Sequence, residues 1–540
     1  MDDGTELSAD VFLPDGPGPH PAILVRTPYE DEGHFDRARA LAAAGFAVVV
    51  QDVRGRFDSD GRFEALVNEG SDGLATQRWM TAQRWSDGTI ATSGMSYMGW
   101  TQLATAAGHA DGVRCMAVRV MAFDPYSGWV YPGGALSHSF AYIWSVFVSD
   151  RTTQDLTQRT WRDPLNSLPL RDAGDAVGRE LGPWKTWLSH PTKDAYWEAL
   201  DVERRAASID VPILGIAGWY DQFAPSMFSG IAALRARGAA GARESRLICG
   251  PWDHWVGDKR IVGEVDFGGG ALVDLDDVEQ RWFERWLADR PSAKAADAPY
   301  RLFIMGSNTW RDEQEWPLAR TEFRRFHLRS AGHANSLDGD GRLSLAAPTD
   351  DEAPDVFAYD PANPVPTVGG ANCCYPEIVA IGPYDQRAVE TRHDVLCYTT
   401  TALAEDLEVT GPVHLELYAA TDGPDTDWTA KLVDIDPQGV ATNLCDGILR
   451  ARYRAGFARA DLLEPGRWYE FRIELGVTAN VFRRGHCIRL EVSSSNFPRF
   501  DRNPNTGESH GDRSAQRVAH QRIFHDQVRA SALILPVIPN

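Results

Sequence analysis

The first third of the chain alternates between short apolar runs and longer segments of helical composition. Apolar runs at 22–25 and 46–50 are typical of strands that are buried on both faces. Between them, FDRARALAAAG consists largely of helix-forming residues and ends at Gly45, which suits a left-handed helix cap. An expected helix near 70–83 and another directly after Ser96 continue the pattern. This order predicts a parallel sheet covered by helices on both faces.

The alternation stops near residue 123 and returns near residue 211. The intervening segment is rich in Trp, Tyr and Pro and contains helix-like stretches such as DAYWEALDVERRAAS, which predicts an inserted helical cap. Beyond about residue 299, short runs of alternating polarity such as VHLELYAAT and WYEFRIELG are separated by turn residues, as in antiparallel sandwiches. We therefore predict an α/β fold class with three parts: an α/β domain at 1–122 and 208–298, a helical cap at 123–207, and an all-β domain at 299–540.

The charge and cysteine content of the 540 residues narrow the choice of partners. The net charge of −22 would repel nucleic acids and anionic membranes, so a small-molecule substrate is expected. The start of the chain lacks the features of a secretory signal, and no apolar run is long enough to span a bilayer. The 7 cysteines are scattered except for the neighbours Cys373 and Cys374, which favours a reducing, cytoplasmic location and no metal site. A homo-oligomer is compatible with this composition.

The segment GMSYMG places Ser96 at the predicted turn from a strand into a helix. A serine there lifts its hydroxyl above the sheet, and Gly94 and Gly99 avoid clashes of side chains with the neighbouring strand or helix. The second glycine comes one position later than in the usual nucleophile motif. From this spacing alone, a nucleophile and a helix-capping serine are equally supported.

The order of two later residues favours the nucleophile. Asp221 follows the predicted strand at 211–218, and His254 follows the next one at 245–250, so both lie where active sites of parallel sheets collect. We expect His254 to act as general base for Ser96 and Asp221 to orient it. Asp253 is a rival acid, but its side chain leaves the backbone in a different direction from that of His254.

Many motifs in the same order give the chain a resemblance to one family. VRTPY, VVVQDVRG, GMSYMG, YPGGALS, GWYDQF, GPWDH, DVLCYTT and SSSNFPRFDRNPNTG resemble the cocaine esterase and Xaa-Pro dipeptidyl-peptidase family of α/β-hydrolases over nearly the whole chain. The resemblance implies an α/β-hydrolase catalytic domain, a helical cap above the site and a C-terminal all-β jelly-roll domain. It also implies an oxyanion hole formed by the hydroxyl of Tyr29 and the backbone N–H of Tyr97, with no cofactor or metal.

The same resemblance implies an acyl pocket lined by Gln51, Trp129, Trp144 and Phe223. From the residues alone, the two Trp side chains are equally suited to the core of the cap. Where esterases of the family offer two bulky apolar groups from the third domain, this chain has Cys373 and Cys374 after GGAN. The identity of the acyl group is therefore left open.

The expected function is a serine hydrolase that cleaves carboxylic esters, with bulky or aromatic acyl parts, through an acyl-enzyme. An Xaa-Pro dipeptidyl-peptidase or a related amide hydrolase or acyl transferase is the first alternative, and a non-catalytic carbohydrate-binding protein is the second. Amino-acid ester hydrolases of this kind place carboxylates two and three residues after the acid, where this chain has Phe223 and Ala224. A buried ammonium group would be costly there, which disfavours substrates with a free α-amino group.

Overall fold

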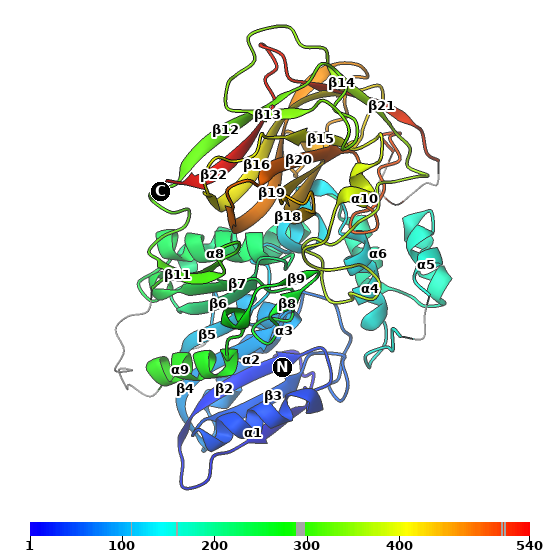
Figure 1. Cartoon of the computed structure of the whole chain (residues 1–540). Coiled ribbons are helices and arrows are strands. Elements are labelled where there is room, and N and C mark those ends of the chain that lie inside the picture. The colour runs from blue at the N-terminus through cyan, green and yellow to red at the C-terminus, as the bar shows by residue number, and fades with distance from the viewer. Residues whose placement is uncertain (110, 158–159, 288–297, 509–510, 512–514, 540) are drawn as a thin grey trace.

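The computed structural model describes residues 1–539 except 110, 158–159, 288–297, 509–510 and 512–514. Within them, a nine-stranded sheet forms the lower half of the molecule in Figure 1. All neighbouring strands are parallel except β1 and β11, the antiparallel edge strands. In spatial order the strands are β1 (Ala9–Phe12), β3 (Ala47–Asp52), β2 (His20–Thr27), β4 (Ser86–Met95), β5 (Val113–Arg119), β6 (Ile213–Gly218), β7 (Arg246–Gly250), β10 (Tyr300–Ile304) and β11 (Thr309–Glu313).

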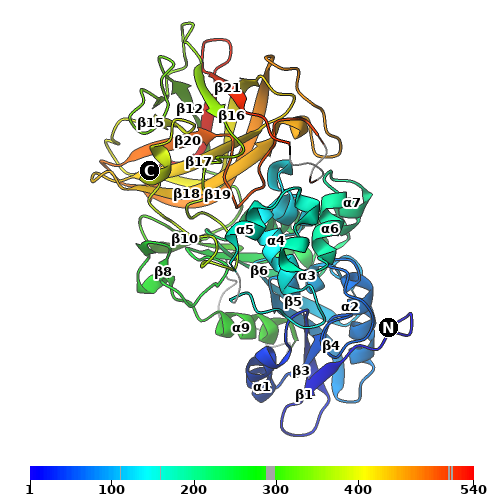
Figure 2. The same ribbon diagram turned by 90° about the vertical axis from the view of Figure 1, so that its right-hand side faces the viewer.

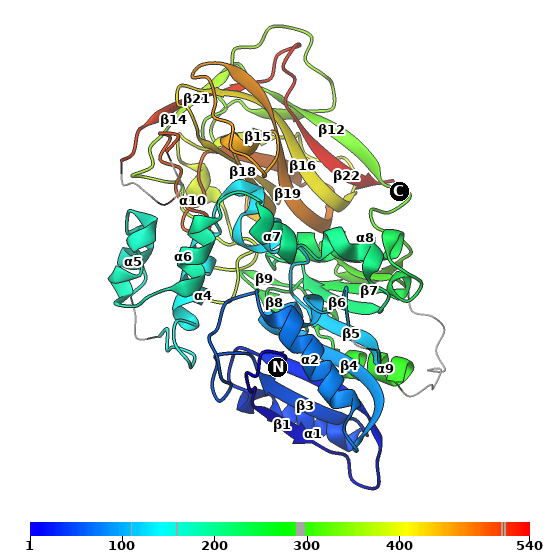
Figure 3. The same ribbon diagram turned by 180° about the vertical axis from the view of Figure 1, so that it is seen from behind.

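Helices cover both faces of this sheet, as the apolar runs predict. α1 (Phe35–Ala43) and α9 (Leu275–Leu287) lie on the face seen in Figure 1. α2 (Glu69–Thr81) and α8 (Ala224–Arg237) lie on the face seen in Figure 3, and α3 (Tyr97–Leu103) packs against α2. Every residue of β3 is buried, because helices cover both of its faces.

The segment between β5 and β6 is a helical cap, which lies between the sheet and the third domain in Figure 2. Its longest helix, α4, is buried along almost its whole length, so it is the core of the cap rather than an amphipathic cover. The helical elements are η2, a π-helical turn (Tyr126–Val130), η3 (Pro132–Gly134), α4 (His138–Phe147), α5 (Arg162–Asn166), η4 (Leu170–Asp172), η5 (Asp175–Val177), α6 (Gly182–Ser189), α7 (Ala195–Leu200) and η6 (Glu203–Ser208).

The third domain is an eleven-stranded, mostly antiparallel β structure in the upper half of Figure 1. Its longest pairing joins β16 to β19, and β19 begins with alternating exposed and buried positions, as expected for a strand with one face toward the core. The strands are β12 (Glu322–Arg329), β13 (Arg342–Ser344), β14 (Asp355–Tyr359), β15 (Leu396–Thr399), β16 (Leu407–Thr421), β17 (Asp427–Ile435), β18 (Ala441–Arg450), β19 (Trp468–Phe482), β20 (Cys487–Ser493), β21 (Ala519–Phe524) and β22 (Ala532–Ile538).

The first sheet continues past the boundary that the sequence predicts at 298/299. β10 pairs in parallel with β7, and β11 folds back on β10, so residues 300–313 belong to the first sheet. The sequence of this edge hairpin is short and alternating, like the sandwich strands that follow it. For this reason the sequence pattern places the domain boundary before the hairpin and not after it.

Close backbone contacts fix the third domain against the cap. The N–H of Leu136 donates to the Asp501 carboxylate (2.9 Å), and the N–H of His138 donates to the carbonyl of Arg499 (2.8 Å). Gly133 has a φ of 58°, and a Cβ atom there would lie 1.7 Å from the carbonyl oxygen of Ile448. Glycine therefore allows the cap and the third domain to meet backbone to backbone.

Among the helices of the described residues, each is too short or too polar to traverse the hydrocarbon core of a bilayer.

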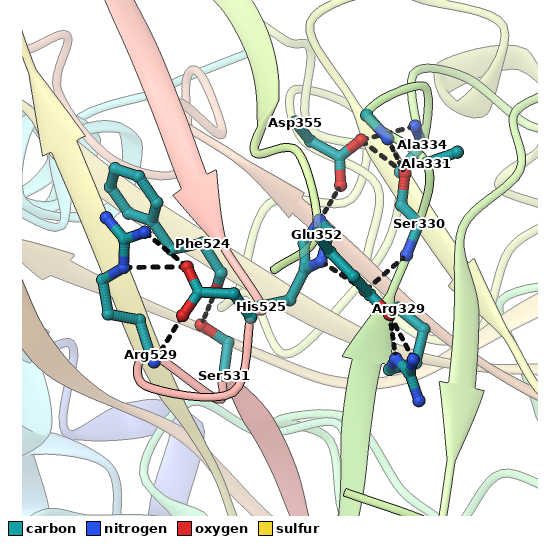
Figure 4. A network of polar contacts seen from close by, with 12 residues as sticks. Arg329, Ser330, Ala331, Ala334, Glu352, Asp355, Phe524, His525, Arg529 and Ser531 are labelled. Atoms are coloured by element: carbon teal, nitrogen blue, oxygen red, sulfur yellow. Dashed lines mark hydrogen bonds and ion pairs between the residues drawn. The ribbon is translucent and has the colours of Figure 1, made fainter. Parts of the chain in front are cut away.

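A buried cluster around His525 stabilises the far end of the third domain (Figure 4). Nδ1 of His525 contacts the Glu352 carboxylate (2.8 Å), and Nε2 contacts the Asp355 carboxylate (3.0 Å). Asp355 also accepts hydrogen bonds from the hydroxyls of Ser330 and Tyr398. Burial alone would lower the pKa of His525, but the hydrogen bonds and charges of Asp355 and Glu352 raise it above its ordinary value.

This cluster predicts a pH-dependent free energy of unfolding. Because the pKa of His525 is raised by folding, its stabilising contribution is complete below the unfolded pKa of about 6.5 and is lost as the pH rises through the folded value. The pKa values of Glu352 and Asp355 are lowered, so their contributions are lost only in acid. Urea unfolding between about pH 6 and 9 should show a decline in wild type that is smaller in His525→Gln.

The exposed His393 provides the control, since His393→Gln should keep the wild-type slope. If the free energy of unfolding changed with pH equally in wild type and His525→Gln, His525 would not be charged in the folded protein.

Candidate active site

Ser96 lies between β4 and α3 in a strained backbone conformation, with φ of 59° and ψ of −129°. Its N–H donates to the carbonyl of Arg119 on β5 (3.0 Å), and its own carbonyl accepts from the N–H of Gly99 (2.7 Å). The side chain of Ser96 makes no capping hydrogen bond to the helix, so the helix-capping alternative has no support in this structure.

The two flanking glycines allow this turn. A Cβ atom on Gly94 would lie 2.5 Å from Cβ of Met98, and one on Gly99 would lie 2.9 Å from Cβ of Met121. Both distances are far below a normal contact, so the turn brings strand and helix too close for any side chain at either position. The sequence argument for Gly94 and Gly99 is confirmed.

Asp221 and His254 meet in the interior after β6 and β7. Oδ2 of Asp221 and Nδ1 of His254 are 2.6 Å apart, and the two residues are 0% and 2% exposed. Oδ1 of Asp221 accepts from the N–H of Phe223 (2.9 Å), which fixes the carboxylate. Nε2 is therefore the ring nitrogen of His254 that remains for a reacting group.

Asp253 does not contact the histidine ring in this way. Its carboxylate accepts from the N–H of Trp255 (2.8 Å) and the ammonium of Lys259 (3.3 Å). Asp221 is thus the acid that holds His254.

Tyr29 lies beside Ser96 at the end of β2. Its oxygen accepts a hydrogen bond from Nε1 of Trp144 in the cap (3.1 Å), which leaves the phenol proton free to point elsewhere. Burial raises the pKa of Tyr29, and hydrogen bonds with Trp144 and Ser96 oppose the rise. Tyr29 therefore keeps its phenol proton at neutral pH and lies in contact with Ser96.

Tyr97 uses its backbone and its side chain differently. As the first residue of α3, it has an N–H group without an acceptor inside the helix. Its hydroxyl accepts from the N–H of Leu66 (2.7 Å) and donates to the buried carboxylate of Glu69 (3.0 Å). These two hydrogen bonds anchor the Tyr97 ring below the turn. The sequence predicts a role only for the backbone N–H of Tyr97 and none for its side chain.

Gln51 lies on β3 in a buried polar network. Its side-chain oxygen accepts from Nε of Arg26 (2.9 Å) and the hydroxyl of Thr76 (2.9 Å). Arg26 also pairs with Glu69 (3.1 Å), so Gln51 supports the same anchor as Tyr97. The sequence alone does not indicate that Gln51 supports this anchor, because only the register of β2 and β3 brings Arg26 and Gln51 together.

The three aromatic residues expected at the acyl pocket form one cluster. The ring centroids of Trp129 and Trp144 are 5.3 Å apart, and those of Trp129 and Phe223 are 5.8 Å apart. Phe223 in turn lies 5.7 Å from the ring of His254. The ring centroids of Trp187 and Phe140 lie 5.5 and 5.8 Å from that of Trp129 and complete the cluster. The aromatic-rich composition of the cap is the one sequence signal that indicates these two residues.

Cys373 and Cys374 reach the same place from the third domain. They are joined by a disulfide, and their sulfur atoms and a ring nitrogen of His254 all lie within 4.8 Å of one another. The sequence shows the two cysteines only as neighbours and does not predict the bond between them. Neighbouring cysteines can pair without any spacing motif.

Comparison with known proteins decides the family. A sequence model of the X-Pro dipeptidyl-peptidase S15 family matches residues 3–256, and a model of the X-Pro dipeptidyl-peptidase C-terminal non-catalytic domain matches residues 293–534. A cocaine esterase of Rhodococcus sp. (strain MB1 Bresler) is 35% identical over 100% of this chain and 97% of its own length. The chain belongs to the cocaine esterase and S15 peptidase family.

Solved structures have the same fold. An aminopeptidase of the marine sediment archaeon Thaumarchaeota archaeon matches with a TM-score of 0.86 at 25% identity, covering 100% of this chain and 95% of the other. An α-amino acid ester hydrolase matches with a TM-score of 0.86 at 24% identity over 99% and 95% of the two chains, and it supports the fold alone. As a member of this family, the protein is a serine ester hydrolase with an α/β-hydrolase domain and a β-rich C-terminal domain.

The close approach at the Ser96 turn predicts the effect of adding one methyl group. Gly94→Ala should lower the free energy of unfolding by about 1–3 kcal/mol and reduce ester turnover, because Met98 must shift to accept the new Cβ. Urea unfolding and initial rates check this. Gly108→Ala is the matched control, since nothing lies within 4 Å of a Cβ there. Equal stability and activity in both variants would refute the steric account of the turn.

Proposed function

We propose that this protein cleaves carboxylic esters with a bulky or aromatic acyl part through an acyl-enzyme on Ser96. The observation that carries the proposal is the buried Asp221–His254 pair, which adjoins an aromatic cluster leading to Tyr29 and Ser96. A general base, an orienting acid and a serine on a strained turn are the parts of nucleophilic acyl transfer.

In the first half-reaction, Oγ of Ser96 attacks the ester carbonyl while Nε2 of His254 takes its proton. Asp221 holds Nδ1 of the ring and offsets the imidazolium charge. His254 then gives the proton to the leaving alcohol. In the second half-reaction, His254 activates a water molecule that releases the acid from Ser96.

The negative oxygen of each tetrahedral intermediate needs donors that are already in place. We assign this task to the hydroxyl of Tyr29 and the backbone N–H of Tyr97. Trp144 donates a hydrogen bond to the Tyr29 oxygen, and the hydrogen bond from the Tyr97 hydroxyl to Glu69 fixes the start of α3. Donors fixed in advance cost no reorganisation when charge develops.

The aromatic cluster supports a preference for a bulky acyl group. Trp129, Trp144 and Phe223 offer flat apolar surfaces beside His254, which suit an aromatic or branched acyl part. Phe223 and Ala224 are buried where amino-acid ester hydrolases hold an ammonium group with carboxylates. An acyl group without a free amine is therefore favoured.

Small-molecule esters or amides are thus the proposed substrates, and nucleic acids, membranes and cofactors have no part in the proposed chemistry. The net charge of −22 supports the first two exclusions, and the serine mechanism needs no cofactor. We place the protein in the cytoplasm, supported by the free thiols of Cys115, Cys249, Cys397, Cys445 and Cys487.

Ester turnover should depend on Ser96. Ser96→Ala should lower kcat on aryl acetate, butyrate and benzoate esters on the order of 10⁶-fold without changing the unfolding transition, while the exposed Ser71→Ala keeps wild-type rates. Glycyl-prolyl and alanyl-prolyl anilides should be cleaved far more slowly than the esters. Faster cleavage of the anilides would make the enzyme a dipeptidyl-peptidase, and near-wild-type activity in Ser96→Ala would end the triad assignment.

Removal of the Tyr29 hydroxyl should affect the transition state more than substrate binding. Tyr29→Phe is expected to lower kcat by roughly 10²-fold or more with a small change in KM. Trp144→Phe, which removes the donor to Tyr29 and part of the ring that packs on Trp129, should lower kcat less. Tyr469→Phe, a remote hydroxyl of the third domain, should have no effect. A rise in KM with unchanged kcat in Tyr29→Phe would make Tyr29 a binding residue instead.

A further inference from the structure

The segment that carries Cys373 and Cys374 is a closed loop of the third domain. Gly370 and Gly382 exchange two backbone hydrogen bonds (2.7 and 2.9 Å) at its base. The side-chain amide of Asn372 donates to the carbonyls of Gly369 (3.0 Å) and Ala380 (2.7 Å) and so spans the loop. The position of the two cysteines is therefore set by several hydrogen bonds.

The base of this loop is also tied to the segment that follows His254. The β8–β9 hairpin (Ile261–Val262 and Val265–Asp266) comes directly after the histidine loop. In its turn, the N–H of Glu264 donates to the carbonyl of Pro383 (2.9 Å), and a Cβ atom on Gly263 would lie 2.3 Å from the same oxygen. A contact between two domains thus fixes the position of the cysteine pair relative to the histidine.

Three strong metal ligands meet as a result. The sulfur atoms of Cys373 and Cys374 and a ring nitrogen of His254 all lie within 4.8 Å of one another, and Cys373 and His254 are buried. Ligand atoms of one tetrahedral zinc ion are roughly 3.5–4 Å apart, given Zn–S and Zn–N bonds of about 2.3 and 2.0 Å. Small side-chain rotations would therefore bring the three atoms around one cation.

We propose that reduced Cys373 and Cys374 form, with Nε2 of His254, an inhibitory site for a thiophilic divalent cation such as Zn²⁺ or Cd²⁺. The inhibition rests on the proposed function, because the cation takes the nitrogen that accepts the Ser96 proton. Two thiolates and an imidazole select soft cations over Mg²⁺, which prefers oxygen ligands. The sequence, which has no C-x-x-C spacing, predicts no metal at these residues.

Reduction of the disulfide by an added phosphine creates the metal site. A phosphine reductant and water convert the Cys373–Cys374 disulfide to two thiols, while the phosphine is oxidised to its oxide. Binding of the cation then displaces both thiol protons. While the disulfide is intact, the sulfur atoms lack the thiolate charge that binds the cation, so catalysis is insensitive to it.

Titration of the full-length protein with Cd²⁺ tests the proposal. After phosphine treatment and removal of excess reagent, wild type should bind one Cd²⁺ per chain with an ultraviolet thiolate-to-metal band, and ester turnover should fall in parallel. Before reduction the band should be absent. Cys373→Ser and Cys374→Ser should each weaken binding at least about tenfold, and Mg²⁺ should neither bind nor inhibit.

Two variants separate the site from its alternatives. Ser96→Ala should bind Cd²⁺ as wild type does, so a failed esterase assignment would leave the binding result intact. Cys487→Ser removes a partly exposed thiol of β20 and should leave both binding and inhibition unchanged. Absence of the band in reduced wild type, its persistence in Cys373→Ser with Cys374→Ser, or its loss in Cys487→Ser would each overturn the proposal.

Discussion

The sharp turn at Ser96 is the constraint around which the catalytic domain is built. A positive φ at a residue with a side chain is unfavourable, and it is held here by backbone hydrogen bonds to β5 and within α3. The turn requires glycine on both sides, because strand and helix approach more closely than side chains allow. The free N–H of Tyr97 and the position of the serine hydroxyl both follow from it.

The remaining parts of the site come from all three parts of the chain. Loops after β6 and β7 bring Asp221 and His254, the cap brings the aromatic rings, and the third domain brings the cysteine pair. Contacts such as Gly133 against Ile448 and Glu264 with Pro383 keep these parts in fixed positions. The third domain, whose family model is described as non-catalytic, therefore places two of its residues beside His254.

Features with a local cause could be predicted from the sequence. The Ser96 turn, its glycines and the order of Asp221 and His254 follow from the geometry of parallel strands, and the structure brings the last two within 2.6 Å. Features that depend on pairing between distant segments could not be predicted. The bond from Arg26 to Gln51 needs the strand register, and the approach of Cys373 to His254 needs the packing of two domains.

The hydrogen bond from Trp144 to Tyr29 links the position of the cap to the readiness of the catalytic centre. Trp144 belongs to α4, whereas Tyr29 belongs to the sheet domain, so displacement of α4 breaks the bond. A molecule with its cap displaced would hold an intact triad but a poorly oriented phenol. The packing of α4 therefore sets the direction of a phenol that belongs to another domain, so catalytic competence is a property of the assembled cap and sheet together.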